Sequence, residues 1–295
     1  MEQPANNIET LIKKNILHIQ DVYKQYEGKT ILNDIDLSVA KSELCTLVGP
    51  SGCGKSTLLK LILGQERPTS GNILIEGKPV GFADTHRGIV YQKYSLFPHL
   101  SVIENVMLGK KLTTGLFGLF RKRNEIKDEA VEYLRKVRLE EHYNKYPHEL
   151  SGGMQQRVAI VQSLIMKPKI LLMDEPFGAL DPGTREDMQM FLLELWEDLK
   201  MNIFFVTHDL EEAVFLGTRV IVISQHYISE KTPNKGGSKI VADYPLQRIA
   251  QSTLAKSSAY YRDLIVQIRR EGFEPQYLQH LEEFNLRHPD SFQTL

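Results

Sequence analysis

The chain has 295 residues, which suffices for one large α/β domain with a sizeable buried core and a small appendage. Lys and Arg total 36 against 37 Asp and Glu, a net charge of -1. No overall positive field therefore attracts a nucleic acid, and we expect no nucleic-acid partner. Two cysteines, Cys45 and Cys53, fit neither a disulfide framework nor a metal knuckle, which favours a reducing cytoplasm. No apolar run reaches the ~18 residues of a membrane-spanning helix.

The first part of the chain predicts strands that lead into a glycine-rich loop. Residues 1–15 are polar and aperiodic, which predicts a frayed leader. Residues 16–20 and 30–39 alternate between apolar and polar side chains, as antiparallel strands do. The apolar run 44–48 then precedes a glycine-rich turn and a helical stretch, 56–63. A strand, a glycine loop and a helix in this order form a phosphate-binding arrangement.

The rest of the chain alternates between predicted helices and strands, which indicates a parallel sheet. Asp209 and Glu212 resemble a variant capping box that opens a helix. The predicted segments are a helix at 124–141, strands at 169–173, 203–206 and 219–223, an amphipathic helix at 188–199, a loop at 231–239, a helix at 257–270 and a tail at 273–295.

The glycine-rich turn has the residues of a phosphate-binding loop, in which backbone N–H groups point at phosphates. Its residues are Gly49, Pro50, Ser51, Gly52, Cys53, Gly54, Lys55 and Ser56. Lys55 would bridge the β- and γ-phosphates, the Ser56 hydroxyl would coordinate Mg²⁺, and Thr57 would reach the α-phosphate. The alternative is a chance match, but the position after an apolar strand makes chance a poor explanation.

Two carboxylates follow a second apolar run, and this pair predicts metal and water chemistry. Asp174 ends the run 170–174 and would hold Mg²⁺ through water. Glu175 comes next and would deprotonate the water that attacks the γ-phosphate. Without the glycine loop upstream, a buried strand followed by a polar turn would be the better explanation.

A third segment places small residues at the start of a helix. Ser151, Gly152 and Gly153 precede a helical run, so they form a second candidate anion site. An ordinary helix start with a serine cap is the alternative explanation.

Together and in this order, these segments resemble the ABC-type ATPases. The resemblance covers residues 16–230 and implies a P-loop NTPase of α/β class, with a RecA-like core, an antiparallel β-subdomain and an inserted α-helical subdomain at about 93–165, followed by an extension at 231–295. It implies ATP and Mg²⁺ as cofactors. Ser151, Gly152 and Gly153 match the signature loop, which covers the γ-phosphate held by the other copy in a head-to-tail dimer.

Four further residues fit the same family pattern. Gln92 resembles the glutamine that senses Mg²⁺ and the attacking water, and His208 resembles the switch histidine that contacts the γ-phosphate. Tyr26 resembles the aromatic residue that stacks on adenine, with a core aromatic as the alternative. Asp181 resembles the D-loop aspartate, which links the two ATP sites, with a simple helix-entry turn as the alternative.

Finer similarities point to importers of nitrate, sulfonate, taurine and bicarbonate. They lie at residues 96–102, 154–157, 181–185 and 240–246. The resemblance implies transmembrane permease subunits and an extracytoplasmic solute-binding protein as partners, and a peripheral position on the cytoplasmic face of the inner membrane. The transported solute is set by those partners and is not encoded here.

Two other functions are alternatives to an importer ATPase, and one segment departs from the family pattern. A soluble ABC ATPase of DNA repair, cluster assembly or translation stays open, although residues 94–106 resemble a surface that receives a permease. A P-loop GTPase or kinase is a poor alternative, because this chain has no Asn-Lys-x-Asp segment of the kind that reads guanine. Residues 112–123 place apolar side chains beside a basic cluster, which predicts either a contact with the permease or lipid headgroups, or a flexible surface loop.

Overall fold

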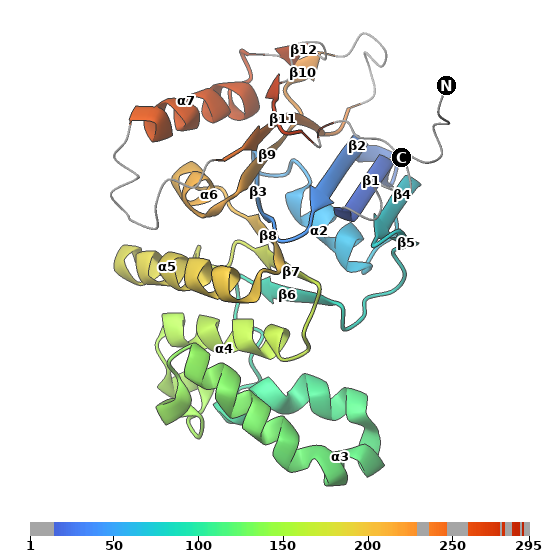
Figure 1. Ribbon diagram of the computed structural model, residues 1–295. Coiled ribbons are helices and arrows are strands. Elements are labelled where there is room, and N and C mark those ends of the chain that lie inside the picture. Colours follow the sequence, from blue (N-terminus) through green and yellow to red (C-terminus); the bar gives the residue numbers. More distant parts are fainter. Residues whose placement is uncertain are drawn as a thin grey trace, which may run out of the picture. The chain divides into compact units, whose positions relative to one another are not determined.

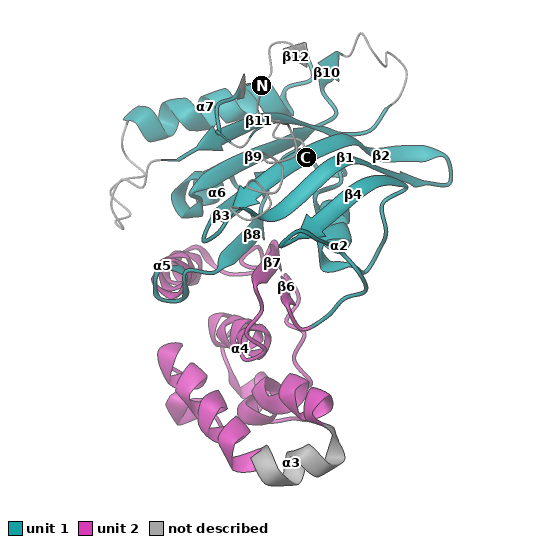
Figure 2. Cartoon of the chain, turned by 45° about the vertical axis from the view of Figure 1, so that its right-hand side comes forward, with its two compact units in different colours: residues 1–84, 196–295 teal, residues 85–195 magenta. Residues whose placement is uncertain are grey.

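The computed structural model describes residues 15–228, 236–246, 259–277, 279–280, 285–289 and 291. The predicted leader lies outside these residues, apart from Asn15. The chain divides into two compact units (Figure 2), one formed by Met1–Asp84 with Trp196–Leu295 and the other by Thr85–Leu195. Among the described residues, no helix combines the length and the apolar character needed to cross a bilayer. The domain limits implied by the family resemblance stay predictions.

The first unit contains an antiparallel sheet with the strand order β2-β1-β4-β5 (Figure 1). Its strands are β1 (Asn15–Tyr26), β2 (Lys29–Ala40), β4 (Ser70–Ile75) and β5 (Lys78–Pro79). Leu17, Val22 and Ile35 are fully buried in it. All five residues of Asn15–Ile19 are buried, so both faces of this part of β1 are covered, rather than one face as the predicted alternation implied. The two predicted strands and their antiparallel pairing are confirmed.

A second sheet of the same unit runs in the order β13-β11-β9-β3-β8. The strands β3 (Leu44–Val48), β8 (Asn202–Val206) and β9 (Arg219–Ser224) are parallel, and every residue in them is buried. Continuous apolar strands of this kind are covered on both faces. The parallel sheet is confirmed for these three strands, whereas β11 (Lys239–Pro245) runs antiparallel to β9 and pairs with β13 (Asn285–Leu286).

Helices α2 (Lys55–Leu63), α6 (Leu210–Leu216) and α7 (Ala259–Phe273) complete the unit, with a two-stranded piece formed by β10 (Tyr227–Ile228) and β12 (Gln279–His280). Helix α7 packs Tyr261, Leu264 and Ile268 into one apolar cluster with Val222 and Val241. The predicted helix 257–270 is thus present from residue 259, and it ends three residues later than expected.

The second unit pairs β6 (Arg87–Tyr91) and β7 (Ile170–Asp174) in parallel and adds the helices α3 (Val102–Lys136) and α4 (Gly152–Leu164). Helix α5 (Pro182–Leu199) begins in this unit. The buried face of α5 carries Met188 and Leu192, as its predicted periodicity requires. Two short 3₁₀ turns, η1 (Glu140–His142) and η2 (Pro147–Glu149), lead toward α4.

Helix α3 folds back on itself. Lys110 and Glu129 form an ion pair, although a straight helix would separate them by about 28 Å at 1.5 Å per residue. The two arms therefore lie side by side, as Figure 2 shows. The backbone of residues 112–123 is helical, so the explanation of the insertion as a surface loop is wrong. The side chains of 115–122 lie outside the described residues, so a contact with the permease or with lipid headgroups is not tested.

The second arm of α3 ends earlier than its sequence predicts. Ile126, Ala130 and Leu134 form the expected buried stripe, but the helix ends at Lys136 rather than at residue 141. Arg138 adopts a left-handed conformation with φ 58°, and the N–H of Leu139 donates to the Leu134 carbonyl at 2.8 Å. This left-handed turn ends the helix, as it does in common C-terminal capping turns.

Candidate active site

The glycine-rich loop connects β3 to α2, and two of its glycines are required by geometry. Gly54 has φ 93°, and a Cβ there would lie 2.7 Å from Leu32 Cδ2. At Gly49 a Cβ would lie 2.0 Å from the carbonyl oxygen of Ile223. Because any side chain would collide or strain the backbone at these positions, the loop wraps as tightly as a phosphate cradle demands.

Lys55 is held across this loop. Its ammonium nitrogen donates to the carbonyl oxygens of Gly49 at 2.8 Å and Pro50 at 3.0 Å, and the residue is 8% exposed. Ser51, Gly52 and Ser56 are exposed at the mouth of the loop, where the N-terminus of α2 carries its partial positive charge. A glycine loop at a helix N-terminus is suited to bind an anion, and in this structure the Lys55 ammonium is bound to the loop's own carbonyl oxygens.

Cys53 is buried in the loop, with 1% of the residue exposed. Burial raises the pKa of its thiol, which lowers its reactivity. An incidental structural role for the thiol fits this position, and alkylating reagents should react with it poorly even without bound nucleotide.

His208 lies at the same edge of the sheet as the loop. Strands β3 and β8 are parallel neighbours, and the N–H of Thr207 donates to Leu47 O at 3.3 Å. Exposed His208 follows directly. Next, Asp209 caps α6 by accepting from the N–H groups of Glu211 and Glu212 at 2.9 and 3.2 Å, which confirms the predicted helix start.

Tyr26 ends strand β1 and is 39% exposed. That exposure argues against the alternative of a core aromatic. Partial burial, together with a hydrogen bond to the Glu66 carboxylate, raises the pKa of Tyr26 to about 12. The phenol therefore stays neutral and is anchored at its hydroxyl end.

In the second unit, Gln92, Asp174 and Glu175 share one edge, because β6 and β7 are parallel with Tyr91 opposite Asp174. Glu175 adopts φ 48°, a sparsely populated conformation for a residue with a side chain. A Cβ on Gly178 would lie 2.9 Å from Gln92 Nε2. The turn after β7 thus packs closely on Gln92 and presents two carboxylates beside it.

Ser151 caps α4, accepting from the N–H of Met154 at 3.3 Å. The ordinary explanation for this serine is therefore observed, and its signature role stays a prediction. A Cβ on Gly152 would lie 2.8 Å from the Tyr94 hydroxyl, and one on Gly153 would lie 2.6 Å from Thr184 Cγ2. Both glycines thus admit close neighbours at the helix start.

Asp181 stabilises the start of α5 by the same kind of side-chain hydrogen bond. Its carboxylate accepts from the N–H of Thr184 at 3.0 Å, and this hydrogen bond is the main reason that the pKa of Asp181 is lowered. The helix-entry turn proposed as an alternative is present, and a role for Asp181 between two ATP sites stays a prediction.

The sequence reasoning missed Asn105, which is fully buried on the first arm of α3. Its side-chain amide accepts from the N–H of Phe97 at 2.7 Å and donates to the carbonyl oxygens of Phe97, Leu100 and Ser101 at 2.9 to 3.1 Å. It fixes the loop before α3. The signal was a polar residue on an otherwise apolar helix face, with Val102 three residues before it and Leu108 three residues after it.

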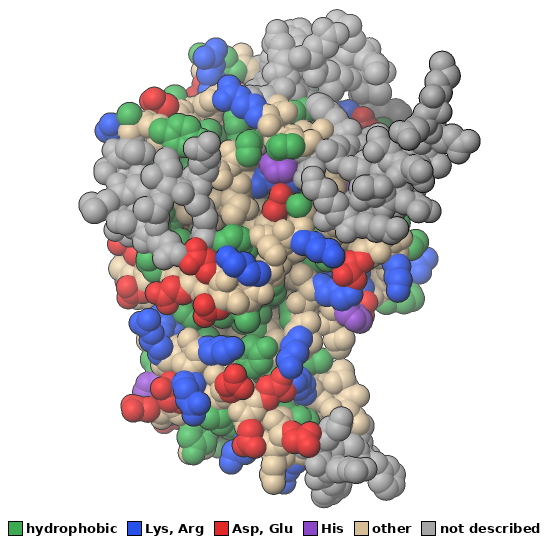
Figure 3. Space-filling view, in the orientation of Figure 1, with side chains coloured by type: hydrophobic (Ala, Val, Ile, Leu, Met, Phe, Trp, Pro, Cys, Tyr) green, Lys and Arg blue, Asp and Glu red, His purple; other side chains and the backbone are tan. Residues whose placement is uncertain are grey.

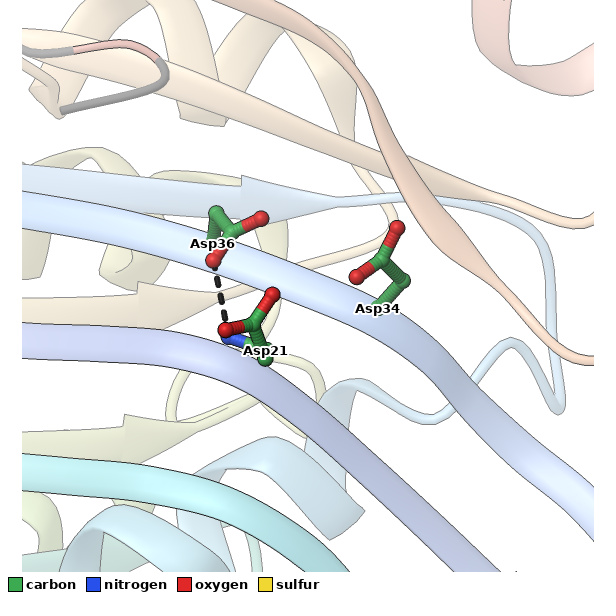
Figure 4. A group of neighbouring side chains, drawn as sticks. All are labelled: Asp21, Asp34 and Asp36. Carbon is green, nitrogen blue, oxygen red and sulfur yellow. Dashed lines mark hydrogen bonds between the residues drawn. The ribbon is translucent and has the colours of Figure 1, made fainter. Parts of the chain in front are cut away.

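A separate acidic group was also not foreseen. Asp21, Asp34 and Asp36 on β1 and β2 have carboxylate oxygens within 4.8 Å of one another (Figure 4). Asp36 accepts from the N–H of Asp21 at 2.8 Å, and Lys239 lies 2.7 Å from Asp34. These contacts offset part of the mutual repulsion, and burial raises the pKa of Asp36.

The predicted Mg²⁺ ligands have suitable chemistry. Ser56 offers an exposed hydroxyl at a helix N-terminus, and Asp174 and Gln92 offer oxygens at one strand edge. Mg²⁺ prefers such oxygen donors together with substrate phosphates. On the face drawn in Figure 3, acidic and basic side chains are interspersed, in keeping with the net charge of -1.

A tight glycine loop between a parallel strand and a helix, crossed by its own lysine, defines the class of P-loop nucleoside triphosphatases. The profile of one family, described as "ABC transporter", matches residues 32–178. The chain is 47% identical over 212 residues to the nitrate import ATP-binding protein NrtD of Synechocystis, covering 70% of this chain and 77% of that protein. It belongs to the ABC transporter family of ATP-binding proteins, whose ATP-binding domains hydrolyse ATP.

Other matches widen the range of related proteins. The spermidine/putrescine import ATP-binding protein PotA of Mycoplasma capricolum is 41% identical over 222 residues, which are 74% of this chain. The chain spans 62% of the length of that relative. The structure of cbiO1 from Clostridium perfringens, part of the ABC transporter complex cbiONQ, superposes with a TM-score of 0.69 at 26% identity, covering 88% of this chain and 98% of that one.

Proposed function

We propose that this chain is the ATP-hydrolysing subunit of an importer and acts as a head-to-tail pair beneath a permease on the cytoplasmic face of the inner membrane. The observation that carries the proposal is the phosphate loop, with buried Lys55 crossing it and Ser56 exposed at the helix start. The import proteins among the relatives support the direction of transport.

Each site residue has a task in this proposal. The loop N–H groups and Lys55 bind the phosphates of ATP, and the Tyr26 ring stacks on adenine. Ser56, Gln92 and Asp174 would hold Mg²⁺, which neutralises charge on the β- and γ-phosphates. Glu175 takes a proton from the attacking water, and His208 donates to the γ-phosphate.

A second copy completes each site. Ser151 is exposed at the N-terminus of α4, so the positive end of this helix is accessible. The signature loop, with Gly152 and Gly153, is therefore suited to bind a γ-phosphate held by the partner copy. Asp181 lies at the start of α5 in the same unit, where it would link the two ATP sites. A two-fold dimer places one signature loop over each phosphate loop.

Two substitutions test the chemistry. Glu175→Gln should abolish turnover, at least 100-fold, and retain bound ATP, because only the proton acceptor is lost. Lys55→Ala should lose ATP binding. Steady-state phosphate release and equilibrium dialysis with radiolabelled ATP measure the two effects. Glu141→Gln, on an exposed carboxylate of η1, is the matched control; hydrolysis by Glu175→Gln at the control's rate would refute the assigned base.

The permease is expected to contact the loop before α3. Phe97 is 44% exposed there, while Asn105 holds the loop backbone. We propose a small anionic or nitrogen- or sulfur-containing solute, supported by the identity to the nitrate importer subunit, although a polyamine importer subunit also matches. A solute-binding protein outside the membrane would deliver it.

Affinity purification of the tagged chain from its host in mild detergent tests the partners. Recovery of a polytopic membrane protein supports the importer, and the ligand of any co-purified solute-binding protein identifies the solute class. Reproducible recovery of soluble factors alone would favour the non-transport ABC ATPase instead.

A further inference from the structure

The hydroxyl of Tyr26 is fixed by a carboxylate from another part of the first unit. Tyr26 donates a hydrogen bond to Glu66 Oε2, and the same oxygen lies 3.0 Å from the ammonium of Lys24. Lys60 lies 3.6 Å from the other oxygen of Glu66. The hydrogen bond from Tyr26 is the main reason that the pKa of Glu66 is lowered, so Glu66 stays ionised as an acceptor.

Glu66 belongs to a turn whose backbone is itself tied down. The turn joins α2 to β4, and its N–H groups at Gln65 and Glu66 donate to Lys60 O at 3.0 and 3.4 Å. At its far end, Thr69 N–H donates to Tyr23 O at 2.8 Å. The ammonium of Lys24 donates to Arg67 O at 2.9 Å. The carboxylate is therefore presented from a fixed backbone.

Lys24 also occupies one side of the tyrosine ring. Its ammonium lies 4.7 Å from the ring centroid of Tyr26, within the range of a cation–π contact. The ring remains 39% exposed. One end of the ring and one face are thus anchored, and the exposed remainder is available to a flat partner.

We propose that Glu66 is a positioning residue for the nucleotide base: it holds the Tyr26 ring, by its hydroxyl and through Lys24, in the orientation in which adenine stacks. This inference rests on the proposed function, in which Tyr26 contacts adenine. Without Glu66 the phenol is free to rotate, so the ring must be ordered when the nucleotide binds. This entropic cost weakens nucleotide binding and leaves the rate of hydrolysis by the bound enzyme unchanged.

The test compares ATP with inorganic tripolyphosphate, which has no base. Binding of each is measured for the full-length protein and for Tyr26→Ala, Glu66→Ala and Glu66→Gln, with KM and kcat for ATP. Asp263→Ala, on an exposed carboxylate of α7 in the same unit, is the control. Glu66→Gln keeps an oxygen acceptor for the phenol and removes the charge, so it also serves if Glu66→Ala fails to fold.

We expect Tyr26→Ala to weaken ATP binding about 5- to 100-fold, the range of base–aromatic stacking. Glu66→Ala should raise KM for ATP about three- to tenfold with kcat unchanged, and Glu66→Gln should do so less. Tripolyphosphate binding should not change in any variant. Glu66→Ala added to Tyr26→Ala should cause no further loss, because Glu66 acts through the ring.

Two outcomes would overturn the inference, and they differ. If Tyr26→Ala weakens ATP binding but Glu66→Ala and Glu66→Gln do not, the positioning role is wrong while the base contact stands. If Tyr26→Ala itself leaves ATP binding unchanged, the base contact in the proposed function is wrong and Glu66 has nothing to position. Equal loss for ATP and tripolyphosphate in the Glu66 variants would indicate a general structural role and also reject the inference.

Discussion

Replacing Asp243 by alanine should destabilise the first unit strongly. Asp243 on β11 receives two hydrogen bonds, at 2.7 and 2.8 Å, from the guanidinium of Arg219 on β9, and their side chains are 2% and 1% exposed. Removing one partner of a buried pair leaves an uncompensated charge and costs about 3–5 kcal/mol. The remaining partners of Arg219, Ser38 O at 2.7 Å and Glu43 at 3.2 Å, offset part of this.

Thermal unfolding followed by circular dichroism measures the effect. A cost of this size lowers Tm by roughly 6–20 °C for a domain of this scale. Glu194→Ala is the matched control, because its pair with Arg138 is 58% and 76% exposed and is worth about 0–1 kcal/mol. Substituting both partners, Arg219→Met with Asp243→Leu, should recover much of the loss. A Tm for Asp243→Ala within 2 °C of the control would refute this account.

Three further outcomes follow from the structure. Gly54→Ala should lose ATP binding, measured by dialysis, and about 1–2 kcal/mol of stability or more, because φ is 93° and the new Cβ meets Leu32; full binding would contradict the tight loop. Asn105→Ala should cost about 1–3 kcal/mol by urea unfolding and reduce permease recovery; unchanged recovery would separate the loop from the permease. Burial raises the pKa of Glu43, but a hydrogen bond from His288 and the charge of Arg219 outweigh it and lower the pKa from its ordinary value. The stabilisation by Glu43 is therefore present above the pKa of the unfolded state and is lost as pH falls through the folded-state pKa. On acidification below the unfolded-state pKa, Tm of Glu43→Gln should fall less than Tm of the unsubstituted protein; parallel curves would reject this.

Local signals predicted the elements around the candidate site well. The apolar run 44–48, the glycine loop and the helix that ends before Gly64 depend on neighbouring residues, and all three are present. The helix caps at Ser151 and Asp209 are local in the same sense. What these residues do for a nucleotide or a second copy depends on partners, so local patterns identify the residues without testing their tasks.

Features that depend on distant pairings were missed. The fold-back of α3 is visible only through the contact between Lys110 and Glu129, which a helical repeat does not encode. The antiparallel direction of β11 follows from its pairing with β9, and an apolar strand has the same composition in either direction. Glu66 lies 40 residues from the Tyr26 hydroxyl that it accepts from, and no sequence spacing announces such a pair.

The division of the chain also bears on the order in which the protein can fold during synthesis. The second unit is one continuous stretch, 85–195, and its internal contacts are complete once that stretch has left the ribosome. Strand β3, which precedes the phosphate loop, pairs with β8 and β9, which lie more than 150 residues later in the chain. The nucleotide-binding loop therefore acquires its strand neighbours only after the whole second unit has been synthesised.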